Sequence, residues 1–234
     1  MGLEREEKRK GGRHMRITMD DLKKNETIST YIKKADESLI SMGYTEHSFA
    51  HVGKVAHDAK MILETLGYPE RDAELAEMAG YLHDIGNVIN RIDHAQSGAV
   101  MAFRILDKMG ADAEDIATIV TAIGNHDEKT AFPVNPVAAA LILADKCDVR
   151  DTRVRNKDHI TFDIHDRVNY SVKESKLLVR PENQEIELKL GIDTTICAVM
   201  DYFEIFLTRM ILCKKAAEKL GMKFVLTING QKLM

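Results

Sequence analysis

The sequence predicts a mainly α-helical domain followed by a smaller α+β region. Over about the first 150 residues, apolar side chains recur at the three- and four-residue intervals of helices, and beyond them they alternate with polar ones as in strands. The 234 residues are 44% hydrophobic, which suffices for one sizeable core. We therefore expect a mobile, charged tail at residues 1–18, a helical domain at 19–155 and an α+β region packed on it at 156–234.

Helix-capping residues, glycines and a proline divide the helical part of the chain. Ser48, Asp112 and Asn135 each precede a run of helical period, and their side chains can accept hydrogen bonds from the free N–H groups of a first turn. Pro136 takes the first helical position after Asn135, where a missing N–H is tolerated. The expected helices cover about residues 27–43, 48–67, 69–86, 93–110 and 112–124, and a sixth begins at Asn135.

Alternating apolar residues predict short strands in the second part of the chain, at about residues 160–164, 177–179, 186–190 and 224–228. A long helix from about Thr194 to Gly221 separates the last two strands. Asn229-Gly230 is a strong hairpin-turn signal after the last strand. Short strands leave sheet edges that favour pairing, so we expect this region to shape a pocket or to form a homodimer.

Composition argues against several classes of protein. The net charge of −4 and the pI of about 6.2 give no basic field for a nucleic-acid polymer. Cys147, Cys197 and Cys213 lack CxxC spacing, which argues against a disulfide framework and a thiolate zinc site. No apolar run approaches the roughly 20 residues of a membrane span, and the charged N-terminus has no signal-peptide core, so we expect a cytoplasmic protein.

Histidines and aspartates gather near predicted helix ends, in apolar or small-residue surroundings. In a bundle of antiparallel helices, the end of one helix lies beside the start of the one before it. His51, which begins one helix, should therefore approach the His83-Asp84 pair, which ends the next. Asp145 lies about nine residues, or roughly 14 Å, beyond Pro136, so it joins them only if its helix crosses the bundle. The candidate metal ligands are His51, His83, Asp84, His94, His126 and Asp145.

These side chains are imidazoles and carboxylates without a thiolate. Such donors suit Fe, Mn, Zn, Co or Ni, and carboxylates also suit Mg. A carboxylate can bridge two ions, and two ions roughly 3.5–4 Å apart can generate hydroxide near neutral pH and neutralise phosphate oxygens. The sequence therefore predicts one or two divalent metal ions as the cofactor.

The ordered set of residues resembles the HD-domain superfamily of metal-dependent phosphohydrolases. The resemblance covers roughly residues 45–150 and depends on "HSFAHVGKVA", "AGYLHDIG" and "LILADKCD", with the His-Asp pair 32 residues after the first histidine. It implies that residues 19–155 contain a helical HD domain. It also implies that a first ion is held by His51, His83, Asp84 and Asp145, and a second by Asp84, His94 and His126.

The activity implied by this resemblance is hydrolysis of a phosphomono- or diester by a metal-activated hydroxide, with Asp84 as the bridging ligand. The expected substrate is a nucleotide or another small phosphate ester. Cyclic-di-GMP hydrolysis is not expected, because Asn87 stands where those relatives have lysine. Two alternatives stay open: a non-hydrolytic metal-binding sensor or interaction module, and a di-iron oxygenase, since some relatives perform that chemistry.

Basic residues near the candidate ligands are expected to contact the substrate. His47, one turn before the first ligand, is a candidate for binding phosphate or for protonating the leaving group. Lys146, Arg150 and Arg153 recur at spacings of four and three, and guanidinium binds phosphate in a bidentate manner. His47 and Lys146 are thus catalytic candidates beside Asp84. The alternatives are simple exposure for His47 and, for the other three, a solvated face balanced by nearby aspartates.

Overall fold

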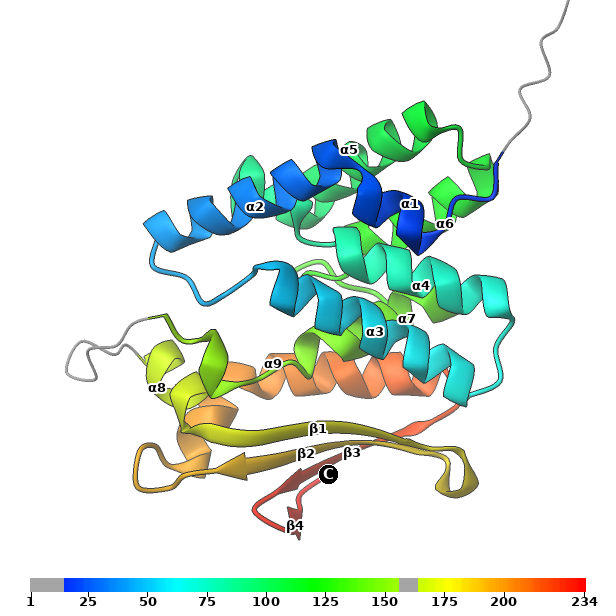
Figure 1. Cartoon of the computed structure of the whole chain (residues 1–234). Helices are drawn as coiled ribbons and strands as arrows, with labels where there is room; N and C mark the ends of the chain where they lie inside the picture. Colours follow the sequence, from blue (N-terminus) through cyan, green and yellow to red (C-terminus); the bar gives the residue numbers. More distant parts are fainter. Residues whose placement is uncertain (1–14, 156–163) are drawn as a thin grey trace, which may run out of the picture.

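The computed structural model describes residues 15–155 and 164–234. Its helices stack in layers above a small sheet (Figure 1). The upper helices are α1 (Met19–Lys24), α2 (Glu26–Ser41), α5 (His94–Met109) and α6 (Ala113–Gly124), and beneath them lie α3 (Phe49–Thr65), α4 (Glu70–Leu82) and α7 (Pro136–Lys146). The long helix α9 (Val199–Lys219) lies between this bundle and the sheet. The predicted fold class, a helical domain followed by an α+β region, is confirmed.

The predicted capping residues begin their helices. Ser48, Asp112 and Asn135 each accept a hydrogen bond from a backbone N–H in the first turn of α3, α6 and α7. The helix that was expected to reach Gly86 ends earlier, because α4 stops at Leu82 and a separate 3-10 turn follows. The His-Asp pair therefore lies at a corner between two helical segments.

Residues 15–18 were predicted to belong to a mobile tail, but they contact the helical domain. Met15 forms a β-bridge in the connection between α5 and α6, and Ile17 is 3% exposed within the core. Thr18 and Asp21 form a reciprocal capping box that begins α1, a helix that the apolar pattern did not predict. Residues 15–18 are thus packed on the helical domain, and residues 1–14 lie outside the described part of the chain.

Helix α7 passes through the middle of the helical domain. Every side chain from Val137 to Ala144 is at most 2% exposed, and the helix packs against α3, α4, α6 and α9. Alanines make up much of this segment, so neighbouring helices can approach it closely. Because α7 crosses the helical domain in this way, Asp145 near its end can reach the other candidate ligands. Although α7 is apolar all round, within the described ranges no helix has the length and apolar character that crossing a membrane requires.

The C-terminal sheet has the order β1-β2-β3-β4. Its strands are Val172–Arg180, Glu185–Ile192, Lys223–Ile228 and Gln231–Lys232. Strands β2 and β3 are parallel and are joined through α9, whereas the other neighbours are antiparallel. Leu188 of β2 pairs with Leu226 of β3, and both are fully buried. The predicted turn after β3 is present, because Asn229 and Gly230 have φ angles of 49° and 81°.

The strand predicted at residues 160–164 is wrong where the structure describes it. Ile164 begins a helix, α8 (Ile164–Ser171), and residues 160–163 lie outside the described residues. Val168 and Ser171 on one side of α8 are fully buried, and the helix packs against α9 and β1. Burial against these neighbours, rather than local alternation, decides the conformation here.

Candidate metal centre

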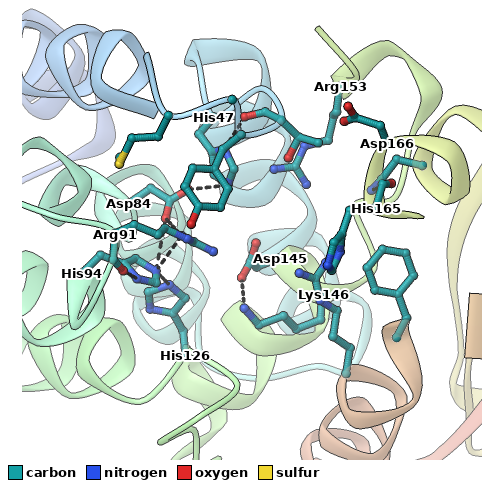
Figure 2. Close-up of a pocket in the computed structure, with 17 residues that line it drawn as sticks. His47, Asp84, Arg91, His94, His126, Asp145, Lys146, Arg153, His165 and Asp166 are labelled. Carbon is teal, nitrogen blue, oxygen red and sulfur yellow. Dashed lines mark hydrogen bonds and ion pairs between the residues drawn. The ribbon is translucent and has the colours of Figure 1, made fainter. Parts of the chain in front are cut away.

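Four of the six predicted ligands line one cavity, and the other two, His51 and His83, are fully buried beside them. Figure 2 shows Asp84, His94, His126 and Asp145 in the wall of this cavity. Each ligand comes from a helix terminus: His51 is in the first turn of α3, His83 and Asp84 follow α4, His94 begins α5, His126 follows α6 and Asp145 is in the last turn of α7. Five segments distant in sequence thus place their donors together.

Two glycines permit this convergence. A Cβ atom on Gly80 would lie 2.7 Å from Ala56 Cα, so glycine lets α4 approach α3 and brings the His83 end of one helix to the His51 end of the other. A Cβ on Gly86 would overlap the carbonyl oxygen of His94 and lie 2.5 Å from Gly98 N. The glycine after the His-Asp pair is therefore required by the close approach of α5.

One group of donors is formed by His51, His83 and Asp145, whose ligand atoms all lie within 4.8 Å of one another. His51 Nε2 lies 3.4 Å from Asp145 Oδ1 and 3.6 Å from Asp84 Oδ2, and His83 Nε2 lies 3.2 Å from Asp84 Oδ2. His51 Nε2, His83 Nε2 and Asp84 Oδ2 are buried without a hydrogen-bond partner among the described residues. Buried polar atoms are normally satisfied, so this convergence fits a bound cation.

Further donors face the other oxygen of Asp84. His94 Nε2 lies 3.6 Å from Asp84 Oδ1 and 3.2 Å from His126 Nε2. The ligand atoms of His83, Asp84 and His126 form a second group within 4.8 Å. Asp84 therefore lies between the two groups of imidazoles, with one oxygen toward each.

The orientation of each imidazole is fixed by its Nδ1 atom. The Nδ1–H groups of His83, His94 and His126 donate to the carbonyl oxygens three residues before them, at 2.7, 3.0 and 2.6 Å. Nδ1 of His51 donates to Asp148 Oδ2 at 2.8 Å. Since carbonyls and carboxylates only accept, the ring proton lies on Nδ1 and the Nε2 lone pair points inward, as in many metal-bound histidines.

Asp148 holds the ring of His51, whereas the sequence suggested it only as one of the aspartates that would balance a solvated basic face. Its side chain is fully buried and also accepts hydrogen bonds from Arg150 Nε at 2.6 Å and Nη2 at 3.0 Å. The structure corrects the prediction for Arg150, which holds Asp148 and is not among the described residues that line the cavity. The feature of the sequence that could have identified Asp148 as part of the site is its position three residues after Asp145.

The remaining basic candidates line the cavity, which has a volume of about 390 Å³. His47 is 8% exposed, and its Nε2 lies 4.0 Å from Asp84 Oδ2. Lys146 Nζ pairs with Asp145 Oδ2 at 2.7 Å and with Glu128 Oε1 at 3.5 Å. Arg153 also lines the cavity, although its Nη1 and Nε bond backbone oxygens at 2.8 and 3.0 Å.

Several cavity residues were missed from the sequence. Arg91 reaches in from the corner after η1 (Ile85–Val88), and His165 of α8 and Arg209 of α9 come from the C-terminal region (Figure 2 labels Arg91 and His165). Arg209 also forms an ion pair with Glu128. The α+β region thus completes the wall of the cavity, and no local sequence motif predicted this role.

The protein sets protonation states that suit metal ligands. Burial alone would raise the pKa values of Asp84 and Asp145, but neighbouring His83 and Lys146 hold these pKa values well below their ordinary range. Burial lowers the pKa of His94 and, more strongly, that of His126. His83 differs, because burial lowers its pKa but ionised Asp84 and Asp145, together with the hydrogen bonds of the ring, outweigh burial and raise the pKa. Ionised carboxylates and mostly neutral imidazoles are the forms that coordinate metals.

The match to a known protein family agrees with this geometry. Residues 48–151 match the HD domain family. This part of the chain is an HD domain. The uncharacterized protein MJ1020 of Methanocaldococcus jannaschii is 27% identical over an alignment of 162 residues that covers 60% of this chain and 62% of that relative, so the chain spans less than two thirds of the relative. A solved structure described as a predicted HD superfamily hydrolase, from an uncultured Thermotogales bacterium, is 25% identical and covers 53% of this chain and 67% of its own, with a TM-score of 0.42.

Proposed function

We propose that this protein is a metal-dependent phosphohydrolase that acts on a nucleotide or another small phosphate ester. The observation that carries the proposal is the set of buried donor atoms of His51, His83 and Asp84 in the HD domain, which have no hydrogen-bond partner in the described part of the chain and lie beside a cavity with basic walls. A divalent ion bound there would lower the pKa of a coordinated water and neutralise phosphate oxygens.

Asp84 is the central ligand in this proposal. Its Oδ2 lies among His51, His83 and His47, whereas its Oδ1 faces His94. Asn87 Nδ2 donates to Asp84 Oδ1 at 2.8 Å and to the Asp84 backbone oxygen at 3.0 Å, which fixes the rotamer of the carboxylate. A carboxylate held in this way presents one oxygen to each group of imidazoles.

The cavity walls support a phosphate ester as the substrate. Arg91, Lys146, Arg153 and Arg209 bring positive charge to the cavity from four separate segments. A volume of about 390 Å³ is within the range of small-ligand sites, which supports a nucleotide-sized substrate rather than a polymer. Lys146 and Arg153 are 5% and 6% exposed, so their interactions with phosphate would be only weakly screened by solvent.

His47 is placed to hold a proton during the reaction. Its Nδ1 donates to the Thr45 carbonyl at 2.7 Å, so its Nε2 presents a lone pair on the side of Asp84. Burial lowers the pKa of His47 well below its ordinary value, so the ring is neutral at pH 7. In this state His47 accepts a proton from water in the cavity, and we assign it that role in preference to protonation of the leaving group.

The test is phosphate release from a panel of nucleotides and simple phosphate esters, with Mn²⁺, Fe²⁺, Co²⁺ or Mg²⁺ added to protein purified without oxygen. Asp84→Asn should reduce turnover by at least about 100-fold while the circular dichroism spectrum is retained. The matched control is Asp58→Asn in the His57-Asp58 pair, because Asp58 accepts a hydrogen bond from Lys54 and is not among the described residues that line the cavity.

Three outcomes would contradict the proposal. Metal binding without turnover of any compound in the panel would favour a sensor or interaction module. Iron-dependent consumption of O₂ without phosphate release would favour an oxygenase. Turnover that is equal in Asp84→Asn and the unaltered protein would show that the activity belongs to another site.

A further inference from the structure

The two faces of Asp84 differ in how their donor atoms are satisfied. On the Oδ2 side, His51 Nε2, His83 Nε2 and Asp84 Oδ2 have no hydrogen-bond partner among the described residues. On the Oδ1 side, Asp84 Oδ1 accepts a hydrogen bond from Asn87, and His94 Nε2 accepts one from Arg91. The two candidate positions for a cation are therefore not equivalent.

Arg91 contacts several of the polar atoms on the Oδ1 side. Its Nη1 donates to His94 Nε2 at 3.3 Å and to Asn87 Oδ1 at 3.4 Å, and lies 4.0 Å from Asp84 Oδ1. Asn87 Nδ2 in turn donates to Asp84 Oδ1 at 2.8 Å. The guanidinium therefore uses the same lone pair of His94 that a second metal ion would need.

The contact between His94 and His126 also calls for positive charge. Both rings donate from Nδ1 to backbone carbonyls, so their Nε2 lone pairs face each other at 3.2 Å. Two ligands on one ion at metal–nitrogen distances of about 2.1 Å have a similar separation, so the pair is spaced for coordination. Arg91 is the nearby cation whose Nη1 reaches one member of the pair.

The position of Arg91 allows it to leave. Its side chain is 25% exposed, lines the cavity and lies with its Cζ atom 5.8 Å from the centre of the Tyr44 ring, which is itself 44% exposed. A rotation of this long side chain into the cavity would uncover the His94 lone pair without disturbing the core.

We propose that the Arg91 guanidinium is the resident cation on the Oδ1 side of Asp84 and competes there with a second metal ion. The centre then binds one ion tightly on the Oδ2 side and a second ion more weakly, because the second must displace Arg91. This inference rests on the proposed metal-dependent function and deepens it by assigning the number of ions to a particular side chain.

The test is a titration of the metal-free protein with Mn²⁺ alone. Calorimetry measures the affinity for each ion, and electron paramagnetic resonance distinguishes an isolated ion from a coupled pair. The unaltered protein should bind one ion tightly and a second at least about ten-fold more weakly. Arg91→Gln should tighten the second ion by about ten-fold or more and leave the first nearly unchanged. Arg91→Lys keeps the charge and should keep the second ion weak.

Arg104→Gln is the matched control, because it removes the same charge from an exposed position on α5 and should leave both affinities unchanged. Equal affinities for two ions in the unaltered protein would overturn the inference. So would an Arg91→Gln protein that retains its thermal transition and binds the second ion no more tightly. A protein that binds no ion on either side contradicts the proposed function itself, whereas one tight ion with no effect of Arg91 contradicts this inference alone.

Discussion

The role of Asp148 gives a prediction that separates a built metal site from a coincidental group of histidines. Asp148→Asn keeps the size of the side chain but removes its charge. The asparagine either turns its NH₂ toward His51 Nδ1, which moves the ring proton to Nε2, or keeps its oxygen there and turns the NH₂ against Arg150. In the first case the Nε2 lone pair of His51 is lost to the proton, and in the second the repulsion between the NH₂ group and Arg150 loosens the side chain that holds the ring.

The size of the effect follows from the buried contacts. Outer partners of metal-bound histidines are typically worth 10–100-fold in affinity, so Asp148→Asn should weaken the first ion by about 1.4–2.8 kcal/mol. The metal-free protein should also lose roughly 2–3 kcal/mol of stability, below the 3–5 kcal/mol of a fully buried pair, because the Arg150 side chain is 28% exposed.

The assay is a competition titration of Mn²⁺ or Co²⁺ against a fluorescent chelator, together with urea denaturation of the metal-free protein. Asp151→Asn is the matched control, because Asp151 pairs with the half-exposed Lys173 at 3.3 Å and should contribute less than about 0.5 kcal/mol. An Asp148→Asn protein that binds the ion as tightly as the unaltered protein would refute the reasoning.

Three further predictions concern packing, pH and metal removal. Gly86→Ala should destabilise the fold by about 3 kcal/mol or more in urea denaturation, because the new methyl group meets the backbone of α5. Gly53→Ala, with open space around its Cβ position, should be neutral or stabilising by up to about 1 kcal/mol. Equal effects of the two substitutions would contradict the argument that Gly86 is required by the close approach of α5. In the metal-free protein, the pKa values of His47, His94 and His126 are lowered on folding, so their contribution to stability is present above the unfolded pKa of about 6.5 and is lost as the pH falls below it. His83 opposes this trend because its pKa is raised, but the free energy of unfolding should still fall between pH 7 and pH 5, and a rise over that range would contradict the assignment of buried neutral rings. Treatment with a chelator should lower the melting temperature, and added Mn²⁺ should restore it in the unaltered protein but not in His83→Ala. The control His57→Ala alters an exposed histidine and should behave like the unaltered protein.

Local signals in the sequence predicted most of the helical domain. Capping side chains and glycines mark helix ends through hydrogen bonds within a few residues, so Ser48, Asp112 and Asn135 identified their helices correctly. The strand expected at 160–164 was wrong at Ile164, because burial against α9 and β1 overrides a short alternating pattern. The packing of Ile17 also depends on distant residues and left no local signal.

The candidate site also consists of residues that the sequence predicted and residues that it did not. The histidines and aspartates could be found from the sequence because the HD pattern places them at helix ends in a fixed order. Arg91 and Arg209 could not, since their approach to the cavity depends on how the corner after η1 and helix α9 pack in three dimensions. Arg150 was assigned to phosphate because its spacing resembles a basic helix face, whereas the chain after α7 turns Asp148 inward and Arg150 follows it.

The most direct test of the account is an anomalous difference map from crystals of the protein grown with Mn²⁺. We predict a peak between His51 Nε2, His83 Nε2, Asp84 Oδ2 and Asp145 Oδ1, with each donor within coordination distance. A protein that binds Mn²⁺ in solution but shows its peak elsewhere, with these four side chains still paired only with one another, would contradict the claim that they form a metal centre.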